Sequence, residues 1–462
     1  MLLLAFLALI PRFILGFLLV QWIWKSSDAK DLIVKIFLAG PVGVGVSSLL
    51  SFLWIWAKLD LRVYALVETV VVLLLLAYII WKQRFSIAEF FKSVRFSLTK
   101  ANTIWITFFG VALLIFIGEF WINAVQNPHG RWDAWSNWNV VARFVYRGGQ
   151  HWTGTFLRIY DHPDYPFLLT MANATTWELL PKETDRGPMV LAFVFTICVA
   201  GLLFSFINSL RGSKTAALAT IVLVTQPMVA YNGMTQFADL PEAYYFLASV
   251  GLILIYLFKR ERTIPILAGL VTGLGMWTKN EGLTFAAINA AAWIIIVWTK
   301  ERSAFKNFLI GITLPLAVVF LFKVFLAPGN DLVTNRQNIL KLIEDISRYE
   351  YIIQKTSIEL WNVGQGPISI IAILVLYTLL TGKTKSPAEG LSYALLIVLI
   401  QLLIYFSVYV ITPYDLDWHI RTSINRLYMH VFPIVILILF LWLKSPSELI
   451  APSSEKQYAP HN

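Results

Sequence analysis

The sequence is poor in two things that most proteins of this length have in quantity, cysteine and charge. Its one cysteine, Cys198, lies inside an apolar run, so the chain can build neither an internal disulfide framework nor a cysteine metal cluster. Only 14% of the 462 residues are charged and 58% are hydrophobic, with a mean hydropathy of +0.69. This composition excludes a soluble fold and predicts an all-α polytopic membrane protein.

Other common features are missing as well. The sequence shows no internal repeat, no low-complexity segment and no separate soluble domain. The first apolar segment, 2–24, has no basic start and no small-residue cleavage site, so it is predicted to be a membrane span rather than a signal peptide. The net charge of +10 comes from Lys and Arg in short loops, as the positive-inside bias predicts. Nucleic acid is therefore not an expected partner.

Apolar runs dominate what remains, and they predict roughly thirteen transmembrane helices. The runs are 2–24, 32–56, 63–81, 103–122, 188–210, 215–231, 241–258, 264–277, 283–299, 307–327, 367–381, 389–411 and 428–443. Two of them, 264–277 and 283–299, are short and form a hairpin broken at 278–282. The basic linker 82–100 is predicted to be an interfacial helix against anionic lipid, and the tail after Lys444 is predicted to be disordered.

The basic loops define one side of the membrane, the cytoplasm. Alternation from span to span then places the N-terminus and four polar features on the external face. These features are the long loop 123–187 and the shorter segments 231–242, 278–282 and 412–426. A further external segment, 328–366, has apolar residues at helical spacing between 339 and 353, which predicts an amphipathic helix over the site or on the bilayer.

The long external loop contains the tryptophan-rich stretch 131–139, centred on Asp133. A carboxylate between Trp132 and Trp135 is typical of a sugar-binding site, although Trp also anchors membrane interfaces. Because 134–147 is predicted to be helical, Asp133 could instead be an N-cap. Further on, Asp161, His162 and Asp164 crowd a proline-rich turn, which favours a structural turn over a metal site.

The two middle external segments add charged residues. Asp239 and Glu242 lie at a predicted helix start, where acids are also favoured for electrostatic reasons alone. Lys279 and Glu281 lie between the two short helices, and charges at membrane depth mark functional sites by default. Lys279 can meet a phosphate, while Glu281 can pair with it or bind a sugar hydroxyl.

The last external segment is basic. A helix from Trp418 would put His419, Ser423 and Arg426 on one face, with Arg421 partly turned away. Arginine is suited to bidentate phosphate binding, although near a helix end it also snorkels to lipid headgroups. Taken together with Lys279, these residues predict a cationic pocket for a phosphate.

These motifs, in this order, resemble the GT-C superfamily of polyprenyl-phosphate-sugar-dependent glycosyltransferases. The likeness is to the bacterial branch related to protein O-mannosyltransferases and to lipid A aminoarabinose or galacturonic acid transferases. It rests on the motifs 132–135, 164–166, 238–241, 278–282 and 418–426. It covers the chain from about Thr103 to the final span, and gives the division 1–102 (N-terminal helices and basic linker), 103–444 (catalytic module) and 445–462 (cytoplasmic tail).

The resemblance implies a GT-C fold and a catalytic role for Asp133 as general base. Many relatives have a second acid directly after this aspartate, whereas Ala134 follows here, so the partner acid is left to Asp239 or Asp164. The implied donor-phosphate contacts are Lys279, His419, Arg421 and Arg426. The expected substrate-binding residues are Trp132, Trp135, Asp164, Tyr165, Glu242 and Glu281.

The predicted reaction is inverting transfer of a sugar from a polyprenyl-monophosphate donor to a hydroxyl of a lipid, glycan or protein, at the periplasmic face of a bacterial inner membrane. Membrane lipids are the other expected partners. No cofactor or metal is required, although a divalent ion held by Asp133, Asp164 and Asp239 is an open alternative. The rival functions are a transporter or flippase of a lipid-linked or anionic solute, and a ligase or polymerase that uses a polyprenyl diphosphate.

Overall fold

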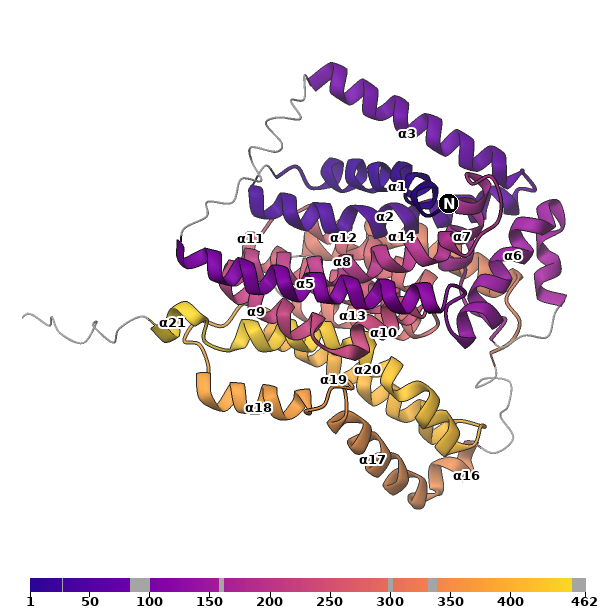
Figure 1. Cartoon of the computed structure of the whole chain (residues 1–462). Helices are drawn as coiled ribbons and strands as arrows, with labels where there is room; N and C mark the ends of the chain where they lie inside the picture. The colour runs from indigo at the N-terminus through magenta and orange to yellow at the C-terminus, as the bar shows by residue number, and fades with distance from the viewer. Residues whose placement is uncertain (27, 84–99, 158–161, 298–301, 331–338, 451–462) are drawn as a thin grey trace, which may run out of the picture.

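The chain folds as a bundle of helices in the computed structural model, which describes residues 1–26, 28–83, 100–157, 162–297, 302–330 and 339–450 (Figure 1). Within these ranges, nine helices are long and apolar enough to cross a membrane. They are α1 (Leu2–Ile23), α2 (Ala29–Trp56), α3 (Leu61–Gln83), α5 (Lys100–Gln126), α8 (Arg186–Arg211), α11 (Asp239–Lys259), α14 (Arg302–Phe325), α19 (Leu391–Ile411) and α20 (Leu416–Trp442). The chain is therefore a polytopic helical membrane protein.

The remaining apolar runs are helical too, but they are short or bent. α9 (Ser213–Val224) and α10 (Pro227–Met234) meet at an angle of 67°. α12 (Ile264–Thr278), α13 (Glu281–Val297) and α18 (Ile370–Thr381) have 15, 17 and 12 residues. The described residues thus hold nine spans, or ten with the bent pair counted as one. The expected count of thirteen is not confirmed, because hydropathy alone does not separate a full span from a shorter buried helix.

Short helices complete the described structure. They are η1 (Ala134–Trp138), α6 (Asn139–Gly148), η2 (Gly149–Leu157), α7 (Leu168–Glu178), α16 (Ile339–Glu344), α17 (Ile346–Trp361) and α21 (Pro446–Ile450). α21 shows that the tail is helical just after Lys444, where disorder was expected. Most of the expected interfacial linker, 84–99, and the rest of the tail, 451–462, lie outside the described residues.

The contacts agree with the prediction that the basic loops lie at one end of the bundle and the polar features at the other. At one end of the bundle, Arg211 donates to the Leu443 carbonyl (2.8 Å) and Arg260 pairs with Glu389 (2.7 Å). At the other end, the Arg131 amide donates to the Thr235 carbonyl (3.1 Å), joining the first two external features. Figure 1 places the N-terminus at this second end, near α6 and α7. The features expected on the external face therefore do lie together.

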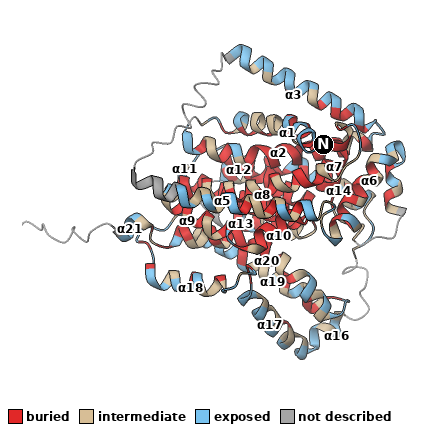
Figure 2. Cartoon of the chain, in the orientation of Figure 1, coloured by how far each residue is buried: buried red, intermediate tan, exposed pale blue. Residues whose placement is uncertain are grey.

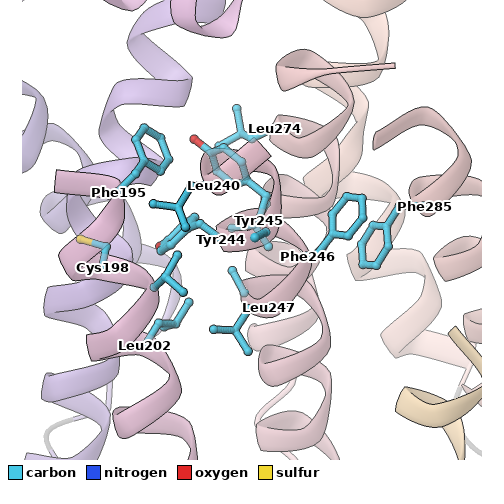
Figure 3. Packing of buried hydrophobic residues seen from close by; sticks show 14 of the residues in the cluster. Phe195, Cys198, Leu202, Leu240, Tyr244, Tyr245, Phe246, Leu247, Leu274 and Phe285 are labelled. Carbon is cyan, nitrogen blue, oxygen red and sulfur yellow. The ribbon is translucent and has the colours of Figure 1, made fainter. Parts of the chain in front are cut away.

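The core is centred on α11, whose membrane-length window is completely buried. Figure 2 shows the buried residues concentrated in the middle of the bundle, with α3, α5 and α18 exposed around it. Phe246 of α11 stacks on Phe285 of α13, with ring centroids 3.7 Å apart (Figure 3). Tyr245 donates to the Pro41 carbonyl of α2 (2.8 Å). The N-terminal helices therefore share one core with the rest of the chain.

α17 is held to the bundle by polar contacts. Arg348 donates to the Val410 carbonyl (3.1 Å), Lys355 pairs with Asp417 (3.2 Å) and Glu359 accepts from Asn425 (3.0 Å). Its exposed side mixes large apolar residues (Ile346, Ile353, Leu360 and Trp361) with polar ones (Glu350, Gln354 and Ser357), while Ile352 is buried. Such a mixed outer side fits a helix that lies at the membrane interface.

α12 and α14 approach closely through glycine. A Cβ on Gly311 would lie 1.9 Å from the Ile266 carbonyl oxygen, and one on Gly269 would lie 2.0 Å from the Phe308 carbonyl oxygen. Small residues at such crossings let membrane helices pack backbone to backbone. This contact fixes the first half of α12 against α14, and Lys279 follows the other end of the same helix.

We expect Gly311→Ala to destabilise the protein by about 1–3 kcal/mol or more, because the added methyl group meets backbone rather than a movable side chain. Gly118→Ala on α5 is the matched control, since no atom lies within 4 Å of its added Cβ. Thermal unfolding in detergent micelles measures both. Equal melting temperatures for the two variants would contradict the close packing of α12 on α14.

Candidate functional site

Asp239 is the centre of a polar cluster at the end of the bundle that was predicted to be external. It lies in the first turn of α11 and is completely buried. Its Oδ1 accepts from Lys279 Nζ (3.0 Å) and His430 Nε2 (3.0 Å), and its Oδ2 accepts from Arg426 Nε (2.9 Å). Three donors on one buried carboxylate offset the cost of removing the charge from water.

Arg426 joins Asp239 to the first external loop. Its Nη1 lies 2.7 Å from Asp133 Oδ2, and its guanidinium also lies over the Phe237 ring. The side chains of Arg426 and Asp133 are 22% and 28% exposed, so both can be reached from solvent. Asp133 has helical backbone angles and makes no capping bond to η1. The N-cap alternative for Asp133 is therefore wrong, because its carboxylate is turned to Arg426.

His430 extends the cluster into the bundle. Its Nε2 faces Asp239, while its Nδ1 lies 2.9 Å from the Tyr405 hydroxyl. A neutral imidazole satisfies both contacts if Nε2 carries the proton and Nδ1 accepts from Tyr405. Sequence reasoning missed His430 and Tyr405. A histidine inside an apolar span, one turn after Arg426, was the available signal for the first.

Lys279 and Glu281 lie at the break between α12 and α13. Lys279 ends α12 with extended backbone angles, which turns its side chain away from the helix. Its Nζ contacts Glu281 Oε1 at 2.7 Å as well as Asp239. Lys279 is buried, so it supports the cluster from within and is not placed to meet a ligand first.

Glu242 lies one turn after Asp239 and is also completely buried. Among the described residues, neither of its carboxyl oxygens has a hydrogen-bond partner. Burying a carboxylate without partners is costly, so this environment favours the neutral acid. Glu242 was expected to bind substrate, but the structure places it inside the bundle, with Oε1 close to Gly282.

The predicted cationic residues do not form one pocket. Lys279 and Arg426 lie together, but Asp133, Asp239 and Glu281 surround them, so two permanent cations face three carboxylates. Two other members lie apart, Arg421 on its own helix with Asp417 (2.8 Å) and His419 against Thr412 Oγ1 (2.8 Å). The cluster therefore has one more carboxylate than permanent cations, and it becomes neutral if one carboxylate moves away or is protonated.

Two of the loop tryptophans remain exposed. Trp132 and Trp135, which precede and follow Asp133 in the sequence, contact each other in an edge arrangement with centroids 4.5 Å apart. Trp138 is buried and stacks on Tyr165 at 5.1 Å. Tyr165 in turn lies near the Lys279 ammonium, which is 5.9 Å from its ring centroid. Of these aromatic residues, the exposed pair is the one accessible to a ligand.

Asp164 binds protein groups. Its Oδ2 accepts from Asn280 (2.8 Å) and Asn330 (2.9 Å) and pairs with Lys323 (3.3 Å). Burial alone would raise the pKa of this carboxyl, but the hydrogen bond from Asn330 and the charge of Lys323 outweigh burial and lower it. The structure thus uses Asp164 to tie the first loop to α14 and to the α12–α13 break.

A chain of buried amides aligns the first two external features. Asn173 Nδ2 donates to Asn139 Oδ1 (3.0 Å), Asn139 Nδ2 donates to Gln236 Oε1 (2.9 Å), and Gln236 Nε2 donates to the Pro128 carbonyl (3.0 Å). These residues hold the segment before Asp133 against the segment before Asp239. Sequence reasoning missed all three, because isolated amide side chains carry no periodic signal.

No three carboxylate, imidazole or thiol side chains are grouped as a metal site in the part of the chain that the structure describes. Asp133, Asp164 and Asp239 each pair with a basic side chain instead. Asp161 lies outside the described residues. A divalent ion shared by the three aspartates therefore has no support from this geometry.

Comparisons with models of protein families, with curated proteins and with solved structures found no match to this chain. The argument for function therefore depends on the geometry of the cluster.

We expect Asp239→Asn to destabilise the protein by about 3–5 kcal/mol, because it leaves buried cations short of a partner. Glu242→Gln should change stability by far less, since an amide replaces a neutral acid of similar size. Unfolding in detergent micelles at neutral pH compares the two. Equal losses of stability in Asp239→Asn and Glu242→Gln would contradict the different roles of these neighbouring acids.

We expect the Asp164 carboxylate to make part of the stability acid-sensitive. Because its pKa is lower in the folded protein than in the unfolded chain, its contribution is complete above the unfolded value of about 4 and is lost as the pH falls through the folded value. Asp164→Asn should be less stable at neutral pH, and its stability should change less than that of the wild type between neutral pH and about pH 3. Equal changes in the stability of the wild type and of Asp164→Asn over this pH range would refute this prediction.

Proposed function

We propose that the chain is an inverting glycosyltransferase, which moves a sugar from a polyprenyl-monophosphate donor to a hydroxyl group at the external face of the membrane. The observation that supports this most is the Arg426 guanidinium between the reachable Asp133 (2.7 Å) and the buried Asp239 (2.9 Å). Sugar transfer needs a base for the acceptor hydroxyl and a fixed cation for the leaving phosphate. Asp133 and Arg426 supply the two groups side by side.

In the proposed step, the acceptor oxygen forms a bond to the anomeric carbon while Asp133 takes the hydroxyl proton. The bond from that carbon to the phosphate oxygen breaks, and its electron pair stays on the phosphate. Arg426 stabilises the developing charge, held in place by Asp239 and, through Asp239, by Lys279 and His430. A cation that is already oriented does not have to reorganise during the reaction.

The surroundings of the cluster fit a lipid-linked sugar. Exposed Trp132 and Trp135 flank Asp133 and offer aromatic faces to a sugar ring. On the other side, Glu359 of α17 accepts from Asn425, the residue before Arg426 (3.0 Å). The outward apolar side of α17 would then lie in the outer leaflet, within reach of a polyprenyl chain attached to the phosphate.

We expect Asp133→Asn to lower kcat for sugar transfer by about 10²- to 10⁴-fold, the usual contribution of a positioned base. Glu389→Gln is the control, because it removes an exposed carboxylate that pairs with Arg260 at the opposite end of the bundle. Transfer is followed by mass spectrometry of lipid extracts and envelope glycans, with and without the protein. Full activity of a folded Asp133→Asn variant would rule out Asp133 as the base.

We expect EDTA to leave transfer unchanged, because Arg426 takes the place that a divalent ion has in metal-dependent transferases. The assay supplies polyprenyl-monophosphate and polyprenyl-diphosphate sugars in parallel. Loss of activity that one divalent ion restores would show a metal requirement, and transfer from the diphosphate alone would favour the ligase alternative.

A further inference from the structure

Asp133 and Arg426 form an ion pair with each other in this structure. Arg426 Nη1 holds Asp133 Oδ2 at 2.7 Å, and Nε is already bound to Asp239. If the proposed function is correct, the base and the phosphate-binding cation are therefore joined by a single ion-pair contact. The substrate would have to act between two groups that leave no space for it.

An inverting displacement cannot proceed with this pair intact. The acceptor oxygen approaches the anomeric carbon from the side opposite the leaving phosphate, with reacting atoms about 3–3.5 Å apart. The base lies beyond the acceptor oxygen and the cation beyond the phosphate. The two groups must therefore be separated by several ångströms, as in inverting glycosidases, where the carboxyl groups stand about 6.5–9.5 Å apart.

The contacts decide which carboxylate leaves Arg426. Asp239 is completely buried and is also held by Lys279 and His430. The Asp133 side chain is 28% exposed, and its only ion pair among the described residues is with Arg426. A phosphate oxygen takes the same place on a guanidinium as a carboxylate oxygen, and two anions so close repel each other. Asp133 is therefore the carboxylate that leaves Arg426.

We propose that the donor phosphate displaces Asp133 from Arg426 and that this exchange frees Asp133 to accept the acceptor's proton. The movement is a rotation of the Asp133 side chain, because the backbone on both sides of Asp133 is anchored. The Arg131 amide bonds to the Thr235 carbonyl before it (3.1 Å), and Trp138 is buried after it. The exchange makes donor binding a condition for acceptor activation, so the donor binds first.

The test measures the affinity of the purified protein, in lipid nanodiscs, for a polyprenyl monophosphate without a sugar. Asp133→Asn removes the anion that competes for Arg426, so its Kd should fall about tenfold, equivalent to about 1.4 kcal/mol. Glu389→Gln, at the opposite end of the bundle, should leave Kd unchanged. Asp133→Glu keeps the charge and should stay near the wild-type value.

An unchanged or higher Kd for Asp133→Asn would overturn the exchange while leaving the proposed function standing, provided that the wild type binds the lipid. If neither the wild type nor Asp133→Asn binds polyprenyl monophosphate, the proposed function fails and the exchange with it. Size-exclusion chromatography establishes that each variant is folded. Should Asp133→Asn not fold, Asp133→Ser carries the same prediction and the same overturning result.

Discussion

The buried carboxylate of Asp239 makes the contacts on which the polar end of the bundle depends. It binds Lys279 at the end of α12 and both Arg426 and His430 on α20, so it joins segments 40 to 191 residues apart in the sequence. A carboxylate with no access to water is stable only with such partners. The geometry of Arg426, and through it that of Asp133, follows from this constraint.

Charge balance is the second property of the cluster. Its two permanent cations face three carboxylates, and the neighbouring Glu242 has no partner among the described residues. The site is therefore not a preformed cationic pocket. An anionic ligand binds there only by taking the place of a carboxylate that the protein already holds, which links ligand binding to the release of Asp133 in the proposed reaction.

The protein positions this cluster with rigid elements and uncharged contacts. The amides of Asn139, Asn173 and Gln236 align the first two external features, and Asp164 ties the first loop to α14 through Lys323. Close glycine contacts fix α12 against α14. α17 is bound to one side through polar contacts, and its exposed side carries large apolar residues that suit the membrane interface.

The sequence by itself determined the class of fold and the grouping of the polar segments. Apolar runs and basic loops are local features, so they predicted a helical membrane protein with Asp133, Asp239, Lys279 and Arg426 at one end. Helix phase indicated that Arg421 is partly turned away from Arg426, but the sequence still grouped it with the donor-phosphate contacts. Only the tertiary structure decided which helices are neighbours, because apolar residues such as Leu and Ile allow many pairings. It therefore also decided that Arg426 holds Asp133, that Glu242 is buried without a partner and that Asp164 binds protein groups, since each depends on distances between segments far apart in the chain.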